Sequence, residues 1–200
     1  TEGARYAVSM IVGRDTERLD EAGITKAAVE TVAENTSDGV TAPLIYIMLF
    51  GAAGGFFYKS VNTMDSMVGY KNDVSRYVGT AAAKLYDGLN FIPSRFTALL
   101  MILAAYIVGL DGKNAFKIWK RDRLKHASPN SAQTESVCAG ALGIRLAGDA
   151  SYFGTIVKKP YIGDATYPVE IEDIPRVNEL MYRTAAICEL LCILILCLIS

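Results

Sequence analysis

The residues that could carry out chemistry in this sequence lie in short polar blocks beside long apolar runs. Each block combines acids or amides with glycine or serine, and most contain a base. Oxygen ligands of this kind suit Mg²⁺, which proteins often hold with one or two carboxylates together with substrate phosphates. The blocks are VGRDT at 12–16, AEN to DG at 33–39, NTMDSMVGYKN at 62–72, DGLNFIPSR at 87–95 and HASPN at 126–130.

Three acids stand at four-residue intervals, Glu30, Glu34 and Asp38. On one continuous helix they would be neighbours, and like charges at this spacing cost a few tenths of a kcal/mol per pair. Lys26 would relieve Glu30, so Glu34 is left for a metal ion or a substrate ammonium group. A solvated acidic face is the simpler explanation of the spacing taken alone.

The block at 62–72 follows an apolar run directly. Asp65, Lys71 and Asn72 are candidate ligand or phosphate contacts, and Gly69 would allow a close backbone approach. An interfacial loop anchored by tyrosines explains the same segment equally well. The sequence contains no GxxxxGK[ST] pattern, so a nucleotide must be held in some other way.

His126 is the single histidine and follows the basic run 117–125. An imidazole titrates near neutral pH, so His126 could act as an acid or base or contact a phosphate. The alternative is a surface histidine at a helix end. The basic run itself is either a solvated face or a contact with anionic lipid headgroups.

Three apolar runs must position these blocks. Segment 39–58 is 20 residues long and uncharged, 96–110 is shorter, and 184–200 contains only Glu189 as a charge. About 20 apolar residues cross a bilayer as a helix, so the sequence predicts an all-α, polytopic integral membrane protein. The alternative is the buried core of a soluble protein. If 39–58 spans fully, the first two blocks and the block at 62–72 lie on opposite faces, unless Pro43 and the GAAGG at 51–55 break it into a re-entrant segment.

Composition excludes several classes of function. The 200 residues hold 20 Lys and Arg against 21 Asp and Glu, which is not the basic charge of a nucleic-acid-binding protein. A hydrophobic share of 52% excludes a disordered polyelectrolyte. One histidine and no CxxC pair exclude a histidine-rich zinc site.

Local signals place the remaining elements. We expect a helix over 26–34 capped by Thr25 and ended by Asn35 and Gly39. A second helix should open at Asp173-Ile174-Pro175 and run into the last apolar segment. Residues 148–172 should form a loop with short extended pieces. The stretch 137–148 should be a packed helix with Glu135 and Arg145 at its two ends.

Taken together and in order, the blocks resemble the adenosylcobinamide-phosphate synthase family of cobalamin biosynthesis (the CbiB/CobD type). YFG at 152–154 followed by KPYIGD at 159–164 completes the series, so the resemblance covers nearly the whole chain. The chain departs from the family pattern at Tyr86, where a second acid is usual, and at Ser131 and Ala132, where Ala-Gly is usual. The family's upstream membrane helices do not occur in these residues, so we expect a single membrane domain that is a fragment of a longer chain.

The resemblance implies a multi-pass enzyme of the cytoplasmic (inner) membrane. Such an enzyme joins adenosylcobyric acid to aminopropanol phosphate, or a related amino alcohol, through an amide bond, and is classed as an ATP-dependent ligase. It implies ATP and Mg²⁺ as cofactors. The implied partners are the corrinoid, the amino alcohol phosphate, the lipid bilayer and other membrane enzymes late in the pathway.

With the resemblance in view, the site residues fall into two groups. Glu34, Asp38 and Asp65 are candidate Mg²⁺ ligands with a catalytic role, and His126 or one of the acids would take the proton from the substrate ammonium. The remaining candidates contact substrate or phosphate: Arg14, Asp15, Asn35, Asn62, Lys71, Asn72, Asp87, Asn90, Arg95, Ser128 and Asn130.

Two other functions compete with the ligase. One is a non-catalytic membrane regulator of the AmpE signalling type, which shares the general layout. The other is a transporter in which Glu189 marks a substrate path. The intact NTMDSMVGY block argues against the regulator, and the lack of an internal repeat argues against the transporter.

Overall fold

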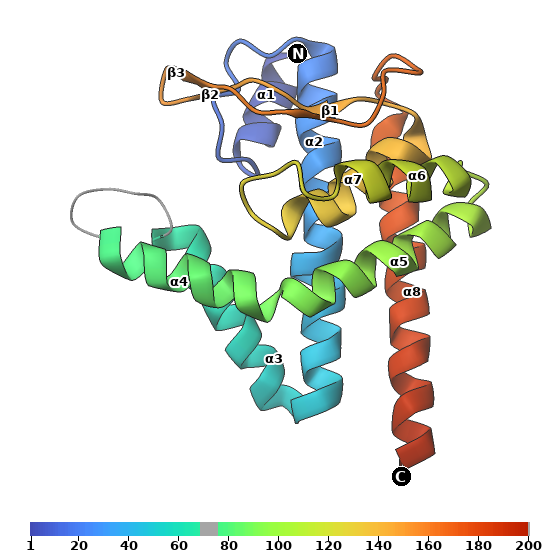
Figure 1. Cartoon of the computed structure of the whole chain (residues 1–200). Helices are drawn as coiled ribbons and strands as arrows, with labels where there is room; N and C mark the ends of the chain where they lie inside the picture. The colour runs from blue at the N-terminus through green and yellow to red at the C-terminus, as the bar shows by residue number, and fades with distance from the viewer. Residues whose placement is uncertain (69–75, 200) are drawn as a thin grey trace.

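The chain is mostly helical in the computed structural model, which describes residues 1–68 and 76–199 (Figure 1). The helical character predicted from the sequence is confirmed, and four short strands add to it. The helices are α1 (Glu2–Ser9), α2 (Glu21–Asn35), the π-helix η1 (Thr36–Thr41), α3 (Ala42–Val68), α4 (Arg76–Leu89), α5 (Phe91–Ile107), α6 (Gly112–Asp122), α7 (Ser131–Leu142) and α8 (Asp173–Ile199). The strands are β1 (Leu146–Ala147), β2 (Ala150–Tyr152), β3 (Thr155–Val157) and β4 (Tyr161–Ile162).

The core is built around α7, whose twelve residues are all buried. It packs against α2, α5 and α6, and its run of small side chains allows them to come close. At Gly140, an added Cβ would lie 2.7 Å from the Cα of Ala115 in α6, so only glycine fits this crossing. Met101, Ile118 and Leu180 fill the space around it from α5, α6 and α8.

The strands form two antiparallel pairs that cover one side of α2. β1 pairs with β4, with Leu146 opposite Ile162, and β2 pairs with β3 as a hairpin. These pairs lie within or next to 148–172, so the predicted loop with short extended pieces is confirmed. α8 begins at Asp173, which agrees with the predicted helix start there.

The stretch 137–148 differs from its prediction. α7 ends at Leu142 because Gly143 takes the left-handed conformation, with φ of 69°. Arg145 therefore lies beyond the helix, with its guanidinium 4.3 Å from the ring centre of Tyr161. Glu135 lies inside the helix rather than at its end.

The prediction for α2 was right in type and right that the helix ends at Asn35, but it was wrong at the start of the helix and at Gly39. Asp20, not Thr25, caps the helix, because its carboxylate accepts a hydrogen bond from Gly23 N–H at 2.8 Å. Thr25 lies inside the helix and is buried. Gly39 does not end the helix, because the chain continues through η1 into α3. Capping preference alone cannot choose between two acceptable residues when burial decides the outcome.

The π-helix η1 has a local cause in Pro43. A proline inside a helix has no N–H, and its ring clashes with the carbonyl four residues earlier, here that of Gly39. The wider π-helical turn directly before Pro43 makes room for the proline ring, so the helix continues into α3. Wider turns of this kind often occur at functional sites, and η1 contains Asp38.

The apolar segment 39–58 reverses direction at Gly51. Its φ of 64° and ψ of −161° lie in a region that essentially only glycine adopts. In one straight helix Tyr46 and Tyr58 would be about 18 Å apart along the axis. Instead their rings stack with centres 4.9 Å apart. Segment 39–58 is therefore the turn of a helical hairpin, in which α3 runs back beside its own beginning (Figure 1).

Close packing holds the two arms of this hairpin together. A Cβ at Gly54 would lie 2.6 Å from the backbone oxygen of Tyr46, and one at Gly55 would lie 2.5 Å from Ile47. The GAAGG sequence thus supplies both the reversal and the contact. The structure takes the re-entrant alternative for this segment.

Several of the longest helical segments are long and apolar enough to cross a membrane. In the described part of the chain, the continuous helical run Glu21–Met67 and α8 are long and apolar enough to cross a membrane, and the pair 79–89 and 91–107, bent by 48°, makes a third if it counts as one span. The run Glu21–Met67 contains the reversal at Gly51, so its length and composition alone overstate how far it extends in one direction. The shorter predicted apolar run falls in α5, and 184–200 falls in α8 apart from Ser200.

We predict that both arms of the hairpin meet the same side of the membrane. Single cysteines at Asn35 and Thr63, both exposed, should react with a membrane-impermeant maleimide added to one side only, in a background without the four native cysteines. A cysteine at the exposed Phe57, nearer the turn, serves as the control and should be protected by lipid. Labelling of Asn35 and Thr63 from opposite sides would contradict the hairpin.

Candidate active site

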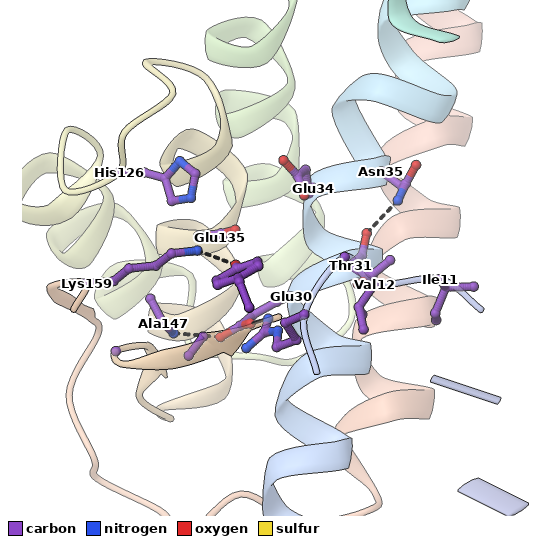
Figure 2. Close-up of a pocket in the computed structure, with 15 residues that line it drawn as sticks. Ile11, Val12, Glu30, Thr31, Glu34, Asn35, His126, Glu135, Ala147 and Lys159 are labelled. Carbon is purple, nitrogen blue, oxygen red and sulfur yellow. Dashed lines mark hydrogen bonds and ion pairs between the residues drawn. The ribbon is translucent and has the colours of Figure 1, made fainter. Parts of the chain in front are cut away.

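A polar pocket of about 300 Å³ lies between α2, α7 and the strands (Figure 2). It brings together four residues that the sequence analysis proposed from three separate blocks, Arg14, Glu34, Asn35 and His126. Further polar side chains that line it were not proposed: Glu30, Thr31, Glu135, Tyr152 and Lys159.

One wall of the pocket is an ion pair that fixes β1 to α2. Arg14 donates to Glu30 Oε2, and Glu30 Oε1 accepts from Ala147 N–H at 2.6 Å. Lys26 donates to the oxygen of Ala147, so this residue is held through both its N–H and its carbonyl. Ala147 has a φ of 57°, which is unfavourable for a residue with a Cβ. The charge of Glu30 acts on Lys26 as expected, while the ion pair with Glu30 is made by Arg14.

Glu34 occupies the centre of the polar groups. Its Oε1 accepts from Ser131 Oγ at 2.8 Å, at the start of α7. Its charge acts on Glu135 and His126 within the pocket. The same charge acts on Asp38 and Asp65, which lie toward α3. A cation bound at Glu34 would therefore be attracted by several carboxylates at once.

Glu135 is the acid that the sequence analysis missed as a site residue. Its side chain comes from the buried helix α7, and its Oε2 has no hydrogen-bond partner among the described residues. Burial raises the pKa of Glu135 well above its usual range, and the charges of Glu34 and Glu30 raise it further. The sequence does carry a signal, because no Lys or Arg occurs between Lys125 and Arg145 to neutralise this acid.

Lys159 and Tyr152 form a basic wall of the pocket. Lys159 Nζ donates to the Tyr152 hydroxyl at 2.5 Å. Both residues belong to the YFG and KPYIGD motifs, which supported the family resemblance but were given no role. An ammonium group at this place suits a phosphate or carboxylate of a ligand.

His126 is placed to donate rather than to accept a proton. Its Nδ1 accepts from Ser128 N–H at 3.1 Å, so the proton of the neutral ring lies on Nε2. Burial lowers the pKa of His126, while the charge of Glu34 opposes this shift. A neutral imidazole with a free Nε2–H suits a phosphate contact. The acids of the pocket are the better candidates for proton acceptor.

Asp38 and Asn90 form a second polar group, behind the pocket. Asn90 Nδ2 donates to Asp38 Oδ1 at 2.6 Å, and Ser37 Oγ donates to Asn90 Oδ1 at 3.2 Å. Asn90 is buried at the junction of α4 and α5. Two predicted residues are thus in contact, but neither lines the pocket.

A third group ties the HASPN block to the α4–α5 junction. Ser128 Oγ donates to Asp87 Oδ1 at 2.9 Å, and Asn130 Nδ2 donates to the backbone oxygen of Asp87 at 3.0 Å. Arg95 Nη1 donates to Asn130 Oδ1 at 3.2 Å. The charge of Asp65 acts on that of Asp87, which places the α3 acid beside this group. Four predicted residues therefore meet here, in contact with the α7 end of the pocket.

The remaining predicted residues lie elsewhere. Asp15 accepts from Ser151 Oγ and from the backbone N–H groups of Phe153 and Gly154, so it fastens the β2–β3 hairpin and does not line the pocket. Asn62 Oδ1 accepts from Lys59 at 3.0 Å on α3. Lys71 and Asn72 lie outside the described residues.

The acids proposed as metal ligands do not form a ligand cluster in the described part of the chain. Among the side chains that the structure describes, no group of three or more His, Cys, Asp or Glu is arranged to hold a metal ion. Glu34, Asp38 and Asp65 are close enough to interact electrostatically without converging on one point.

The fold and the pocket define a mostly helical protein that has helices apolar enough to cross a membrane and a pocket lined by both acids and bases. The family model described as CobD/Cbib protein matches residues 1–181, so the chain belongs to the CobD/Cbib family. The cobalamin biosynthesis protein CobD of Clostridium perfringens is 50% identical over 197 residues, which cover 98% of this chain and 62% of that protein. The protein of the same name from Listeria monocytogenes is 48% identical over 184 residues, covering 92% and 58%.

A relative with the other family name shows the same relation. The cobalamin biosynthesis protein CbiB of Salmonella typhimurium is 46% identical over 197 residues, covering 98% of this chain and 62% of that protein. The chain thus spans about three fifths of the length of the curated relatives described here. No solved structure matches the chain.

Proposed function

We propose that the chain takes part in cobalamin biosynthesis, as the part of an adenosylcobinamide-phosphate synthase that carries its catalytic pocket. The reaction is the ATP-dependent formation of an amide bond between adenosylcobyric acid and aminopropanol phosphate or a related amino alcohol phosphate. The observation that carries the proposal is the pocket itself, in which blocks far apart in the sequence place acids against Lys159, Arg14 and His126. Membership of the CobD/Cbib family supports the pathway.

The reaction sets requirements that this pocket meets. The amine must lose a proton before it attacks a carboxyl carbon, and the phosphate of the amino alcohol must be held. Glu34 and Glu135 are the acceptors for the proton. Lys159 and the Nε2–H of His126 would hold the phosphate, because both point donors at the pocket while their other contacts are made within the protein.

The donors present fit Mg²⁺, because this ion needs only one or two carboxylates when substrate phosphates and waters complete its shell. Glu34, which lines the pocket, would hold it directly, while Asp38 and Asp65, which do not converge with Glu34 on one point, would attract it through their charge. Bound together, ATP and Mg²⁺ would supply the phosphoryl group that makes the corrin carboxylate electrophilic and offset the charge on the phosphates. Arg14 and Arg95 are the chain's own bases near this region, and both are partly buried.

The setting of the proposed enzyme is the cytoplasmic membrane. The apolar hairpin and α8 would lie in the bilayer, with the polar pocket at its surface where the water-soluble amino alcohol phosphate and ATP arrive. The long corrinoid would bind across the adjoining strand surface. Association with other membrane enzymes of the late pathway would pass the product on without release.

The proposal is tested by Asp65→Ala in the intact membrane protein. We expect amide formation from adenosylcobyric acid, amino alcohol phosphate and ATP to fall by about a hundredfold or more, because the charges of Glu34, Asp87 and Asp65 interact and Asp65 would help to attract the Mg²⁺ that offsets the charge of the phosphates. Product is measured by chromatography of membrane vesicles. Thr63→Ala, two residues away and exposed, is the control and should keep its activity. A wild-type protein that forms no amide would contradict the function, and an active Asp65→Ala would remove this residue from the site.

A further inference from the structure

The inner end of the pocket holds a carboxylate that the fold leaves unpaired. Glu135 is only 6% exposed, and its Oε2 makes no hydrogen bond to any described residue. It projects from α7, whose close packing leaves the side chain little freedom to turn toward water. Buried carboxylates are normally paired or hydrogen-bonded, so this one calls for an explanation.

The bases around Glu135 are already committed to other partners. Arg14 donates to Glu30, which also accepts from Ala147 N–H. Lys159 donates to the Tyr152 hydroxyl at 2.5 Å. Figure 2 shows Glu135 near the end of Lys159, and Glu34 lines the same pocket. The charges of Arg14 and Lys159 act on Glu135, but among the described residues neither Glu135 nor Glu34 forms an ion pair with a base.

We propose that Glu135, together with Glu34, binds the primary ammonium group of the amine substrate. This inference rests on the proposed function and assigns the amine end of the substrate to one wall of the pocket. Lys159 and the Nε2–H of His126, which line the same pocket, then receive the phosphate end. An amino alcohol phosphate carries both charges, so its ammonium would meet the two acids and its phosphate would meet these two donors.

An ammonium group fits this place better than a hydrated metal ion. Mg²⁺ requires near-octahedral coordination and usually keeps several waters, which a nearly enclosed carboxylate gives no room for. A primary ammonium has three N–H donors and no acceptor, so it satisfies carboxylate oxygens directly. An anionic group would be repelled here, because both free side chains are acids.

The test compares two ligands that differ only in the charged group. Binding of an amino alcohol phosphate and of the matching diol phosphate, in which a hydroxyl replaces the ammonium, is measured by calorimetry on the intact protein in detergent. We expect the wild type to prefer the amine by about tenfold or more, because charge-assisted hydrogen bonds are roughly twice as strong as neutral ones. Glu135→Gln, which keeps the shape and removes the charge, should reduce this preference to about one.

Controls separate a binding role from a structural one. Glu172→Gln removes an exposed acid from the start of α8 and should keep the wild-type preference. Glu135→Asp keeps the charge on a shorter stem and should give an intermediate preference. The wild-type comparison does not depend on any variant, so it stays informative if Glu135→Gln fails to fold.

Each outcome decides the inference. An unchanged preference in a folded Glu135→Gln would overturn it while leaving amide formation by the wild type, and hence the proposed function, intact. A wild type that forms the amide but binds both phosphates equally would also overturn it. Stabilisation of the wild type by Mg²⁺ alone that is lost in Glu135→Gln would replace the ammonium site with a metal site. A wild type that binds neither phosphate would overturn both the inference and the proposed function.

Discussion

We expect Arg14→Met to lower the free energy of unfolding by about 3 to 5 kcal/mol. The substitution leaves the Glu30 carboxylate, whose side chain is 7% exposed, without its cation. An isolated buried charge is far more costly than the pair that it replaces, because the desolvation of the remaining carboxylate is no longer offset. The loss should appear in detergent-solubilised protein as a lower transition midpoint on heating or in denaturant.

A second substitution, at Glu30, shows whether the stranded carboxylate causes this loss of stability. Adding Glu30→Gln to Arg14→Met removes the stranded charge and keeps an acceptor for Ala147 N–H, so it should recover most of the stability. Arg183→Met is the matched control, because its ion pair with Glu179 is exposed and such pairs contribute little. Equal losses in Arg14→Met and Arg183→Met would show that the buried pair has no special importance.

We expect Glu34→Gln to reduce amide formation by about a hundredfold to a thousandfold with little change in fold. The glutamine oxygen can still accept from Ser131 Oγ, so the local hydrogen bond survives while the charge is lost. That charge acts on Glu135 and His126 in the pocket and on Asp38 and Asp65 behind it. Activity is measured in membrane vesicles with ATP, adenosylcobyric acid and the amino alcohol phosphate.

A second readout connects Glu34 to Mg²⁺. If this acid helps to hold the ion, Mg²⁺ should raise the melting temperature of the wild type, and Glu34→Gln should blunt the rise. Glu21→Gln, on the exposed first turn of the same helix, is the control and should behave as the wild type. Equal stabilisation in wild type and Glu34→Gln, with full activity, would remove Glu34 from the pocket and favour a purely structural role.

Much of the helical framework could be predicted from local sequence. The apolar runs became helical segments, and Asp173 with Pro175 marked the start of α8. These features depend on neighbouring residues only, because periodicity and capping act within a few turns. Arg14, Glu34 and His126 were named as site residues from their chemistry and the family resemblance rather than from any local rule, and the structure places all three in one pocket.

The rest depended on contacts between distant segments. Burial of Glu135 arises because α2, α5 and α6 enclose α7, which no local pattern of that helix reveals. Lys159 lies just before β4, and the pairing of β4 with β1 brings it to the pocket. This pairing joins residues that are far apart in the sequence. The start of α2 was misplaced because Asp20 and Thr25 are both good caps, and packing chose between them. The reversal at Gly51 was left open because a continuous apolar run looks the same whether it crosses or turns back.

The reversal at Gly51 affects the membrane topology that is expected for the rest of the chain. A segment that enters and leaves a membrane by the same face adds no membrane crossing. Residues 39–58 would therefore leave the chain on the side of the membrane from which it entered. Hydropathy counting would assign one crossing here and would invert the sidedness of every later segment. In a membrane, a hairpin at Gly51 would place both of its arms on one side, so the acids of α2 and α3 would be open to the same compartment.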